Sequence, residues 1–296
     1  MSWGESMITI GNDRFTVEIN ELGAELSALL DGRTGIQYIW DAGPAWRRRA
    51  PVLFPNVGGY KENAYLFQGR RYEIVPHGLA RDWLFTVAGR GADYVTMLLR
   101  WDEETLKMYP FKFEFYITHR LTGNTLSVEW TVRNLSDEEM FFAVGGHPGF
   151  KFIPGTYIGA YTMEFEKAID IITGRINGRF FDPTPVILAE NVKQIRLDPA
   201  LFEKDVIVLE NRVESVTLSD SKDYRLAVRF PGFPLVGLWT APAALPNAEY
   251  LCIEPWFGIG DYIHEEIHDI RERPYIQSVA PGGEWNNAYY IDAGNV

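Results

Sequence analysis

The stretch LSVEWTV, Leu126 to Val132, alternates apolar and polar side chains at every step. Because successive side chains of a strand point to opposite faces of a sheet, this alternation predicts a strand that is buried on one face only. Turn-forming residues flank it, TGN at 122–124 before it and NLSD at 134–137 after it. The stretch therefore indicates an antiparallel sheet with one face packed on a core.

Similar short runs, separated by turn residues, recur along the whole chain. They predict strands at Met7–Ile10, Arg14–Ile19, Glu25–Leu30, Gln37–Trp40, Tyr65–Phe67, Arg71–Val75, Leu84–Ala88, Val95–Trp101, Phe111–His119, Thr125–Arg133, Glu139–Val144, Val206–Glu210, Ser215–Ser219, Tyr224–Phe230, Val236–Thr240, Tyr250–Glu254 and Ala288–Ile291. Only two short segments fit a helix, Glu190–Gln194 and Ile263–Ile270. Many short strands without a linker or an internal repeat favour an antiparallel sandwich or barrel. We therefore expect an all-β protein that forms a single domain over residues 1–296.

The chain has 296 residues, and its 46% of hydrophobic residues is ordinary for a globular protein. Its net charge of −12 disfavours nucleic acids and anionic membranes as partners, because both are bound through basic patches. The single cysteine, Cys252, excludes an intramolecular disulfide. The N-terminus lacks the pattern of a signal peptide, and no run reaches the roughly 18 apolar residues of a membrane span. We expect a cytoplasmic protein that is a monomer or a weak homodimer.

The stretch GGHPGF, Gly145 to Phe150, follows an apolar run and contains one of only five histidines. Glycine lets the backbone approach a ligand closely and Pro148 stiffens the turn, so the ring of His147 would have a fixed direction. Histidine gains and loses a proton near neutral pH, which suits a general acid. The stretch alone leaves two interpretations open: an exposed turn histidine, or a proton donor held over a pocket.

Three other clusters have the composition of functional loops. Residues 50–59 place two prolines around an apolar core and end in glycines, which indicates either a shaped binding loop or a packing turn. His77 and Arg81 lie close together in HGLAR, where they either bind a polar ligand or lie exposed at the surface. Glu254 ends an apolar strand in CIEPWFG. Apolar surroundings raise the pKa of a carboxylate, as a general base requires, although an ion pair with an arginine is the alternative.

The sequence HEEIH at residues 264–268 matches the H-E-x-x-H pattern of zinc proteases. On a helix, this spacing would place two imidazoles one turn apart. The segment is short and charged, is soon followed by Pro274, and lacks a convincing third ligand. We therefore expect no metal and no other cofactor, and keep a zinc hydrolase as a distant alternative.

Together, these clusters resemble the aldose 1-epimerase (galactose mutarotase-like) family, in particular its LacX-like branch. The resemblance spans nearly the whole chain through six ordered motifs, at residues 50–55, 77–81, 146–150, 201–205, 252–256 and 280–283. It implies a β-supersandwich in which a sugar binds in a cleft on one concave face. It also implies that His147 is the general acid and Glu254 the general base. His77 would contact the sugar, and Asp205 would bind its hydroxyl groups.

Several positions depart from the family pattern. Gly59 replaces the arginine that follows the Phe-Pro motif in the family, so Arg81, Arg47 or Arg49 would have to supply that sugar contact. His-Gly-Leu stands where His-Gly-Phe is usual, and Pro-Gly-Phe where Pro-Tyr-Phe is usual. These changes leave the acid and the base in place but leave the identity of the sugar open.

Aromatic residues make up 14% of the chain, and the core of a large β protein can contain many of them. Aromatic rings also stack on the flat apolar face of a pyranose. We consider Trp256, Phe150 and Tyr60 as candidates for this contact.

The resemblance implies an enzyme that interconverts the α and β anomers of an aldohexose, a small-molecule sugar substrate. One alternative is a relative that acts on a hexose 6-phosphate, for which Arg81 and the arginine run at residues 47–49 are candidate phosphate ligands. Another is a non-catalytic carbohydrate-binding protein, although such a protein would not need both His147 and Glu254.

Overall fold

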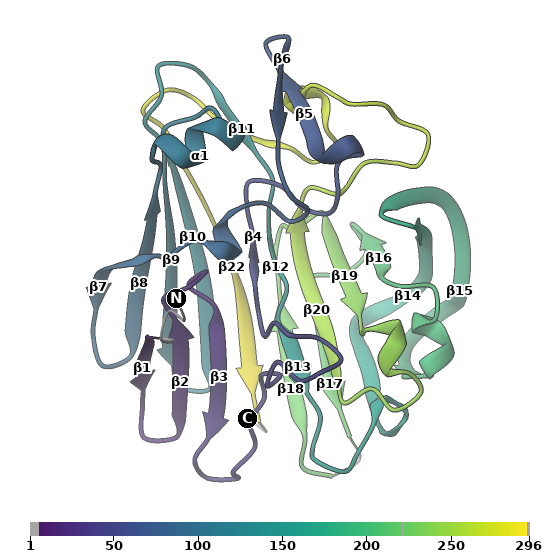
Figure 1. Cartoon of the computed structure of the whole chain (residues 1–296). Helices are drawn as coiled ribbons and strands as arrows, with labels where there is room; N and C mark the ends of the chain where they lie inside the picture. The colour runs from purple at the N-terminus through teal and green to yellow at the C-terminus, as the bar shows by residue number, and fades with distance from the viewer. Residues whose placement is uncertain (1–5, 221, 295–296) are drawn as a thin grey trace.

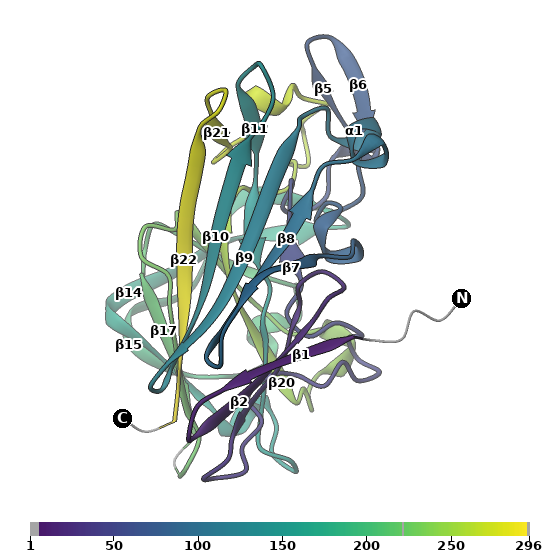
Figure 2. The same ribbon diagram turned by 90° about the vertical axis from the view of Figure 1, so that its left-hand side faces the viewer.

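Two antiparallel sheets dominate the computed structural model, which describes residues 6–220 and 222–294 (Figure 1). The larger sheet has nine strands in the order β15-β14-β17-β18-β22-β10-β9-β8-β7. These strands are β7 (Thr86–Arg90), β8 (Tyr94–Arg100), β9 (Phe113–Thr122), β10 (Thr125–Asn134), β14 (Thr162–Asn177), β15 (Phe180–Arg196), β17 (Ser215–Ser219), β18 (Arg225–Arg229) and β22 (Glu284–Ala293). Figure 2 shows β22, β10, β9 and β8 side by side, with β10 in the register that its alternating sequence requires.

The second sheet has six strands in the order β16-β19-β20-β12-β4, with β13 also paired to β20. They are β4 (Val52–Leu53), β12 (Val144–Gly146), β13 (Gly149–Lys151), β16 (Ile207–Glu210), β19 (Leu235–Trp239) and β20 (Tyr250–Phe257). Three small sheets complete the strands: β1 (Met7–Gly11), β2 (Phe15–Asn20) and β3 (Leu26–Asp31); β5 (Ala64–Phe67) and β6 (Arg70–Glu73); β11 (Met140–Phe142) and β21 (Gln277–Val279). The prediction of an antiparallel β-sandwich is confirmed.

Helical structure is sparse among the described residues. The α-helix α1 (Glu103–Met108) begins at a capping box, in which Asp102 and Thr105 exchange side-chain and backbone hydrogen bonds. Short 3₁₀ turns are η1 (Lys61–Asn63), η2 (Ala80–Asp82), η3 (Ile158–Ala160), η4 (Pro199–Phe202), η5 (Pro242–Ala244) and η6 (Ile270–Glu272). No helix in residues 6–220 or 222–294 is both long and apolar enough to cross a membrane. Residues 1–5, which belong to the segment inspected for a signal peptide, lie outside the described residues.

Both predicted helices are wrong. Residues 190–194 belong to β15, because the long hairpin β14–β15 pairs its strands over almost their whole length. Residues 263–269 are irregular, because other segments occupy their backbone groups: Lys61 Nζ donates to Ile263 O, and Ile263 N donates to Phe181 O. The expected strand at 37–40 forms only isolated bridges.

The core lies between the two large sheets, and β20 contributes one face to it. Leu251 and Ile253 belong to the same buried cluster as Phe115 of β9 and Trp130 of β10. Glu254, next along the strand, must therefore project from the opposite face of the sheet. All eight residues of β20 are buried, so this outer face is covered as well.

The loop that follows β6 is shaped by a glycine. Gly78 has φ +76°, and a Cβ at this position would lie 2.2 Å from the carbonyl oxygen of Phe54. The same oxygen accepts hydrogen bonds from the backbone N–H groups of Leu79 and Ala80. The carbonyl cannot move away without breaking these bonds, so residue 78 must be glycine. His77, immediately before it, also has a positive φ of 65°.

We predict that Gly78→Ala lowers the free energy of unfolding more than Gly123→Ala does. Gly123 is the matched control, because its φ is +58° but a Cβ added there would meet no atom within 4 Å. The control should cost about 1–2 kcal/mol, the strain of a left-handed alanine. Gly78→Ala should cost about 1–3 kcal/mol more, because of the backbone overlap. Urea unfolding followed by tryptophan fluorescence measures both, and equal losses would show that the loop accommodates the methyl group.

Candidate active site

The register of β20 places His147 opposite Glu254. On one side of β20, Gly145 of β12 pairs with Trp256, and Gly149 of β13 pairs with Cys252. Continuing this register through the residues between β12 and β13 aligns His147 with Glu254. Side chains directly opposite on antiparallel strands lie close together. The observed distance from His147 Nε2 to Glu254 Oε2 is 3.1 Å.

The imidazole of His147 is held by aromatic neighbours. The Trp46 ring stacks on it at a centroid distance of 4.8 Å and an interplanar angle of 28°. Trp239 and His77 make edge-on contacts with the His147 ring, at centroid distances of 5.5 Å and 6.0 Å. The backbone N–H of His147 donates to Pro51 O at 3.1 Å. These contacts fix the direction of the ring, as the glycine- and proline-rich sequence indicates.

Burial controls the protonation of the pair. It lowers the pKa of His147 well below the usual 6.5, and the neighbouring His77 lowers this pKa further. Burial also raises the pKa of Glu254 well above 4.5, with a further rise from Asp205 and an opposing effect from the Trp256 indole. Both shifts favour the uncharged forms, a neutral imidazole and a protonated carboxyl. Because the two groups are in contact, they titrate as a coupled pair.

His77 is a neutral hydrogen-bond donor above this pair. Its Nδ1 accepts a hydrogen bond from the backbone N–H of Gly58 at 3.3 Å, which leaves the ring proton on Nε2. Burial, with the positive charges of Arg81 and Arg48, lowers the pKa of His77 to about 3. The ring therefore stays uncharged throughout the physiological range.

The floor of the site is formed by Trp256, whose indole lies across two glycines. A Cβ on Gly145 of β12 or on Gly237 of β19 would lie 2.6 Å from this ring. Asp205 stands beside the floor with a positive φ of 74°, and its Oδ1 accepts a hydrogen bond from the Val206 N–H at 2.8 Å. Burial raises the pKa of Asp205. Hydrogen bonds from the Val206 N–H and the Trp239 side chain oppose this rise.

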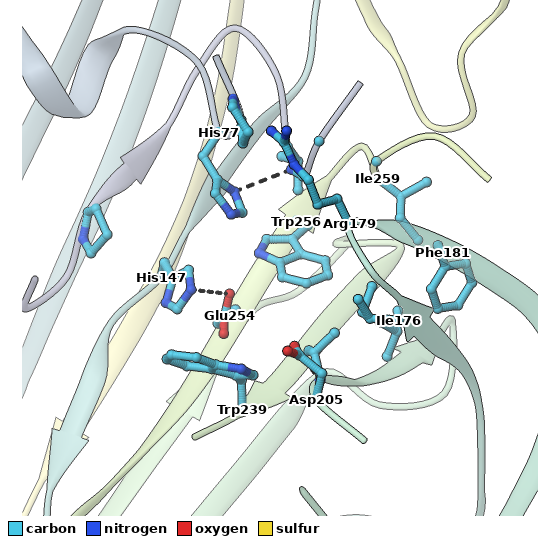
Figure 3. A pocket seen from close by; sticks show the side chains of 18 of the residues that line it. His77, His147, Ile176, Arg179, Phe181, Asp205, Trp239, Glu254, Trp256 and Ile259 are labelled. Atoms are coloured by element: carbon cyan, nitrogen blue, oxygen red, sulfur yellow. Dashed lines mark hydrogen bonds and ion pairs between the residues drawn. The ribbon is translucent and has the colours of Figure 1, made fainter. Parts of the chain in front are cut away.

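These residues surround one cavity of about 430 Å³ (Figure 3). The expected site residues that line it are His77, Arg81, His147, Asp205, Glu254 and Trp256. His147 and Glu254 lie together on one side of the cavity, and Figure 3 shows Ile176, Phe181 and Ile259 beyond Trp256, together with Arg179 and Asp205. Its size is typical of a small-molecule site.

Three expected binding residues lie elsewhere. Phe150 is fully buried in the main core, because it pairs with Leu251 and shares its face of the sheet. Tyr60 is also in the core, where the guanidinium of Arg273 lies 3.3 Å from its ring centroid. Arg49 does not line the cavity, and its backbone N–H donates to a buried carboxylate, Glu25. Arg47, the other arginine considered, does not line the cavity either, and the lining residue of this run is Arg48.

Other lining residues were not expected from the sequence. Val206, Val208 and Trp239 line the cavity because alternate residues of β16 and β19, and of the chain just before β16, face it. The period of two in these strands was a usable signal. No such signal exists for Trp46, which lies in an irregular loop, or for Arg179, which lies between β14 and β15.

A metal does not fit either candidate site well. His147, Cys252 and Glu254 offer three ligand atoms that all lie within 4.8 Å of one another. Burial raises the pKa of the Cys252 thiol, which disfavours the thiolate that zinc binds. His264 and His268 of the H-E-x-x-H sequence lie in an irregular segment, so the helical spacing that this pattern needs is missing.

Comparisons with known proteins agree with this geometry. The sequence profile described as aldose 1-epimerase matches residues 6–288. The plasmid and chromosomal LacX proteins of Lactococcus lactis subsp. lactis are each 30% identical over 302 aligned positions, covering 96% of this chain and 98% of theirs. The structure of a galactose mutarotase related enzyme from Lactobacillus acidophilus is 32% identical, with a TM-score of 0.91 and 98% of each chain covered. A galactose mutarotase-like protein from Lactobacillus casei is 26% identical, with a TM-score of 0.89, covering 97% of this chain and 100% of its own. The chain therefore belongs to the aldose 1-epimerase family and has the galactose mutarotase-like β-sandwich fold.

Proposed function

We propose that this protein is an aldose 1-epimerase that interconverts the α and β anomers of an aldohexose. The contact of 3.1 Å between His147 Nε2 and Glu254 Oε2, on the wall of a sugar-sized cavity, carries this proposal. Membership of the aldose 1-epimerase family supports the same reaction.

Anomer interconversion needs one acid and one base that reach oxygens of a single carbon. Glu254 takes the proton from the C1 hydroxyl, and His147 gives a proton to the ring oxygen as the bond between that oxygen and C1 breaks. Rotation about the C1–C2 bond presents the other face of the aldehyde, and the reverse transfers close the ring. The two oxygens are both bonded to C1, so acid and base must lie close together. Two groups in direct contact, which the sugar separates on binding, satisfy this condition.

The proton inventory of the buried pair matches the reaction. The lowered pKa of His147 and the raised pKa of Glu254 favour a resting pair that holds one proton on Glu254 beside a neutral His147. Transfer of this proton within the pair produces the carboxylate base and the imidazolium acid, and nothing has to be exchanged with bulk water. Positioned proton transfer of this kind typically accelerates a reaction by about 10²–10⁴-fold.

The remaining polar residues orient the sugar in this proposal. The Nε2–H of His77 donates to a ring or hydroxyl oxygen, and Asp205 accepts from hydroxyl groups. The faces of Trp256 and Trp239 are available for the apolar face of a pyranose.

We predict that His147→Ala and Glu254→Gln each lower kcat by about 10²–10⁴-fold and change sugar affinity little, because each removes a proton-transfer group. NMR exchange between the two anomeric protons of glucose and galactose measures the rate, and tryptophan fluorescence measures binding. His264→Ala and Glu266→Gln are matched controls outside the cavity and should keep wild-type rates. Wild-type turnover in either site variant would refute the assignment of acid and base.

The pH dependence of kcat/KM should follow the single shared proton. On the acid side, activity falls when His147 takes up a second proton; its pKa is lowered, so this limb must lie below pH 6.5. On the alkaline side, activity falls as the proton leaves Glu254, through its raised pKa. We therefore expect a bell-shaped profile with its acid limb centred below pH 6.5 and its alkaline limb centred above pH 4.5, after subtraction of the uncatalysed rate in each buffer. An acid limb centred above pH 6.5 would contradict this protonation scheme.

A further inference from the structure

The loop of residues 41–51 lies over the imidazole of His147, although it forms neither helix nor strand. Its Trp46 stacks on the His147 ring and lines the cavity. A Cβ on Gly149 would lie 2.8 Å from the Trp46 ring, so the indole also packs against the backbone just beyond His147. At the end of the loop, the carbonyl oxygen of Pro51 accepts the His147 N–H. The position of this loop therefore sets the surroundings of His147.

A carboxylate from a distant part of the chain holds this loop. Oε1 of Glu25 accepts hydrogen bonds from the backbone N–H groups of Arg49 at 2.8 Å and of Ala50 at 3.0 Å. The carbonyl oxygen of Arg49 accepts from the N–H of Gly149 at 2.8 Å, so the backbone of Arg49 is fixed between Glu25 and β13. Backbone N–H groups that lose their partners in a buried place are costly. The loop therefore depends on the Glu25 oxygen to keep its path.

A strained turn gives the Glu25 side chain its direction. Glu25 lies between β2 and β3, directly after Gly23, with φ +72°, and Ala24, with φ +47°. A left-handed alanine costs about 1–2 kcal/mol, and such strain persists where neighbouring contacts fix the backbone. Here Nε2 of the buried His119 donates to the Ala24 carbonyl oxygen at 3.0 Å. A Cβ on Gly23 would lie 2.8 Å from the carbonyl oxygen of Arg81. The turn is thus packed on both sides.

The charge of Glu25 suggests a second role, which has to be separated from the first. Burial raises the pKa of Glu25, whereas the two backbone N–H groups and the charges of Arg48 and Arg49 oppose this rise. Burial and the charge of Arg48 lower the pKa of Arg81, and neighbouring carboxylates, Glu25 among them, oppose that change. Glu25 is therefore both an acceptor for the loop and a counter-charge for arginines beside the cavity. The hydrogen bonds are the contacts that fix the loop.

We propose that Glu25 is a positioning residue, which acts on His147 through Trp46. Its carboxylate oxygen holds the backbone of Arg49 and Ala50, and the loop then keeps the Trp46 indole against the imidazole. This gives a role in the site to the sheet β1–β3, none of whose described residues lines the cavity. The inference rests on the proposed function for its effect on catalysis, but the position of Trp46 against His147 is measurable without any sugar.

Three substitutions of Glu25 separate its reach from its charge. Both N–H groups donate to one oxygen, so the amide oxygen of Glu25→Gln is able to accept both without the charge. Glu25→Asp keeps the charge but withdraws the oxygens by one methylene group, and Glu25→Ala removes them. Glu25→Ala and Glu25→Asp should lower kcat about 10- to 100-fold, with a smaller change in KM, because His147 is less well placed. Glu25→Gln should restore most of the rate.

NMR exchange between the anomeric protons of glucose and galactose measures these rates. Glu18→Ala, on β2 of the same small sheet, is the matched control and should keep the wild-type rate. If Glu25→Gln is as slow as Glu25→Ala, the charge matters and not the hydrogen bonds, and the proposed role is refuted.

A double-mutant cycle tests whether Glu25 acts through Trp46. Trp46→Ala should lower kcat by a factor similar to that of Glu25→Ala. The double variant should match Trp46→Ala within about twofold, because the second substitution removes a contact that is already lost. Two independent effects would multiply instead, and this result would overturn the positioning role.

A spectroscopic measurement on the resting protein separates this inference from the proposed function. The chain has five histidines, and the Hε1 signal of His147 is the one that is missing from His147→Ala. Its chemical shift should change in the same direction in Trp46→Ala and in Glu25→Ala, because both remove the ring current of the stacked indole. It should keep its wild-type value in Glu25→Gln and Glu18→Ala.

The two kinds of measurement fail independently. If the wild-type protein converts sugars and Glu25→Ala leaves the His147 signal unmoved, the positioning role is refuted and the epimerase function stands. If no sugar is converted, yet the signal moves as expected, the epimerase function fails and the positioning of His147 by Glu25 stands. Should Glu25→Ala fail to fold, Glu25→Asp and Glu25→Gln decide the question by the same measurements.

Discussion

The contact between His147 and Glu254 is the constraint on which the rest of the site depends. Two ionisable groups are withdrawn from water, and neither has a strong counter-charge that would hold it ionised in the resting state. Burial of an isolated charge in a protein interior is costly, whereas burial of a neutral imidazole beside a protonated carboxyl costs much less. The pair is therefore stable as an uncharged unit, and in the proposed reaction it becomes an acid and a base when one proton moves between the partners.

The fold supports this contact because the two faces of the smaller sheet differ: one packs in the core and the other faces the cavity. In β20, Leu251 and Ile253 pack in the core, while Glu254 and Trp256 face the cavity. Their spacing is fixed by ladders to β12, β13 and β19, so the catalytic geometry follows from sheet register and not from loop conformation. Near the pair, the backbone is strained at His77, which has a positive φ. Two hydrogen bonds with Gly58 hold this residue: its ring Nδ1 accepts from the Gly58 N–H, and its backbone N–H donates to Gly58 O. Strain of this kind persists where surrounding contacts over-determine the backbone.

The sequence indicates the sandwich because alternation is a local pattern, whereas the acid and base roles of His147 and Glu254 were expected from the family resemblance. Alternation identifies most strands, and glycine and proline around His147 indicate a fixed ring. The errors share a different cause. Tyr60 and Phe150 are aromatic residues beside functional motifs, but which face an aromatic side chain takes depends on pairing partners that are distant in the chain. The hairpin β14–β15 was not predicted, although β14 alternates at Met163 and Phe165; register shifts interrupt its pairing with β15, so the period of two does not continue along the hairpin.

Arg48 and Arg81 line the cavity of a protein whose net charge is −12. Their positive charges disfavour protonation of the two histidines in the site. Burial lowers the pKa of both His77 and His147, and the charges of Arg81 and Arg48 lower both further. A protonated His77, with its ring 6.0 Å from that of His147, would oppose the imidazolium that the reaction requires. The Nδ1 of His77 is already occupied by the Gly58 N–H, so this ring can accept no second proton without losing that bond. His77 is thereby excluded as a competing base, and proton movement is confined to His147 and Glu254.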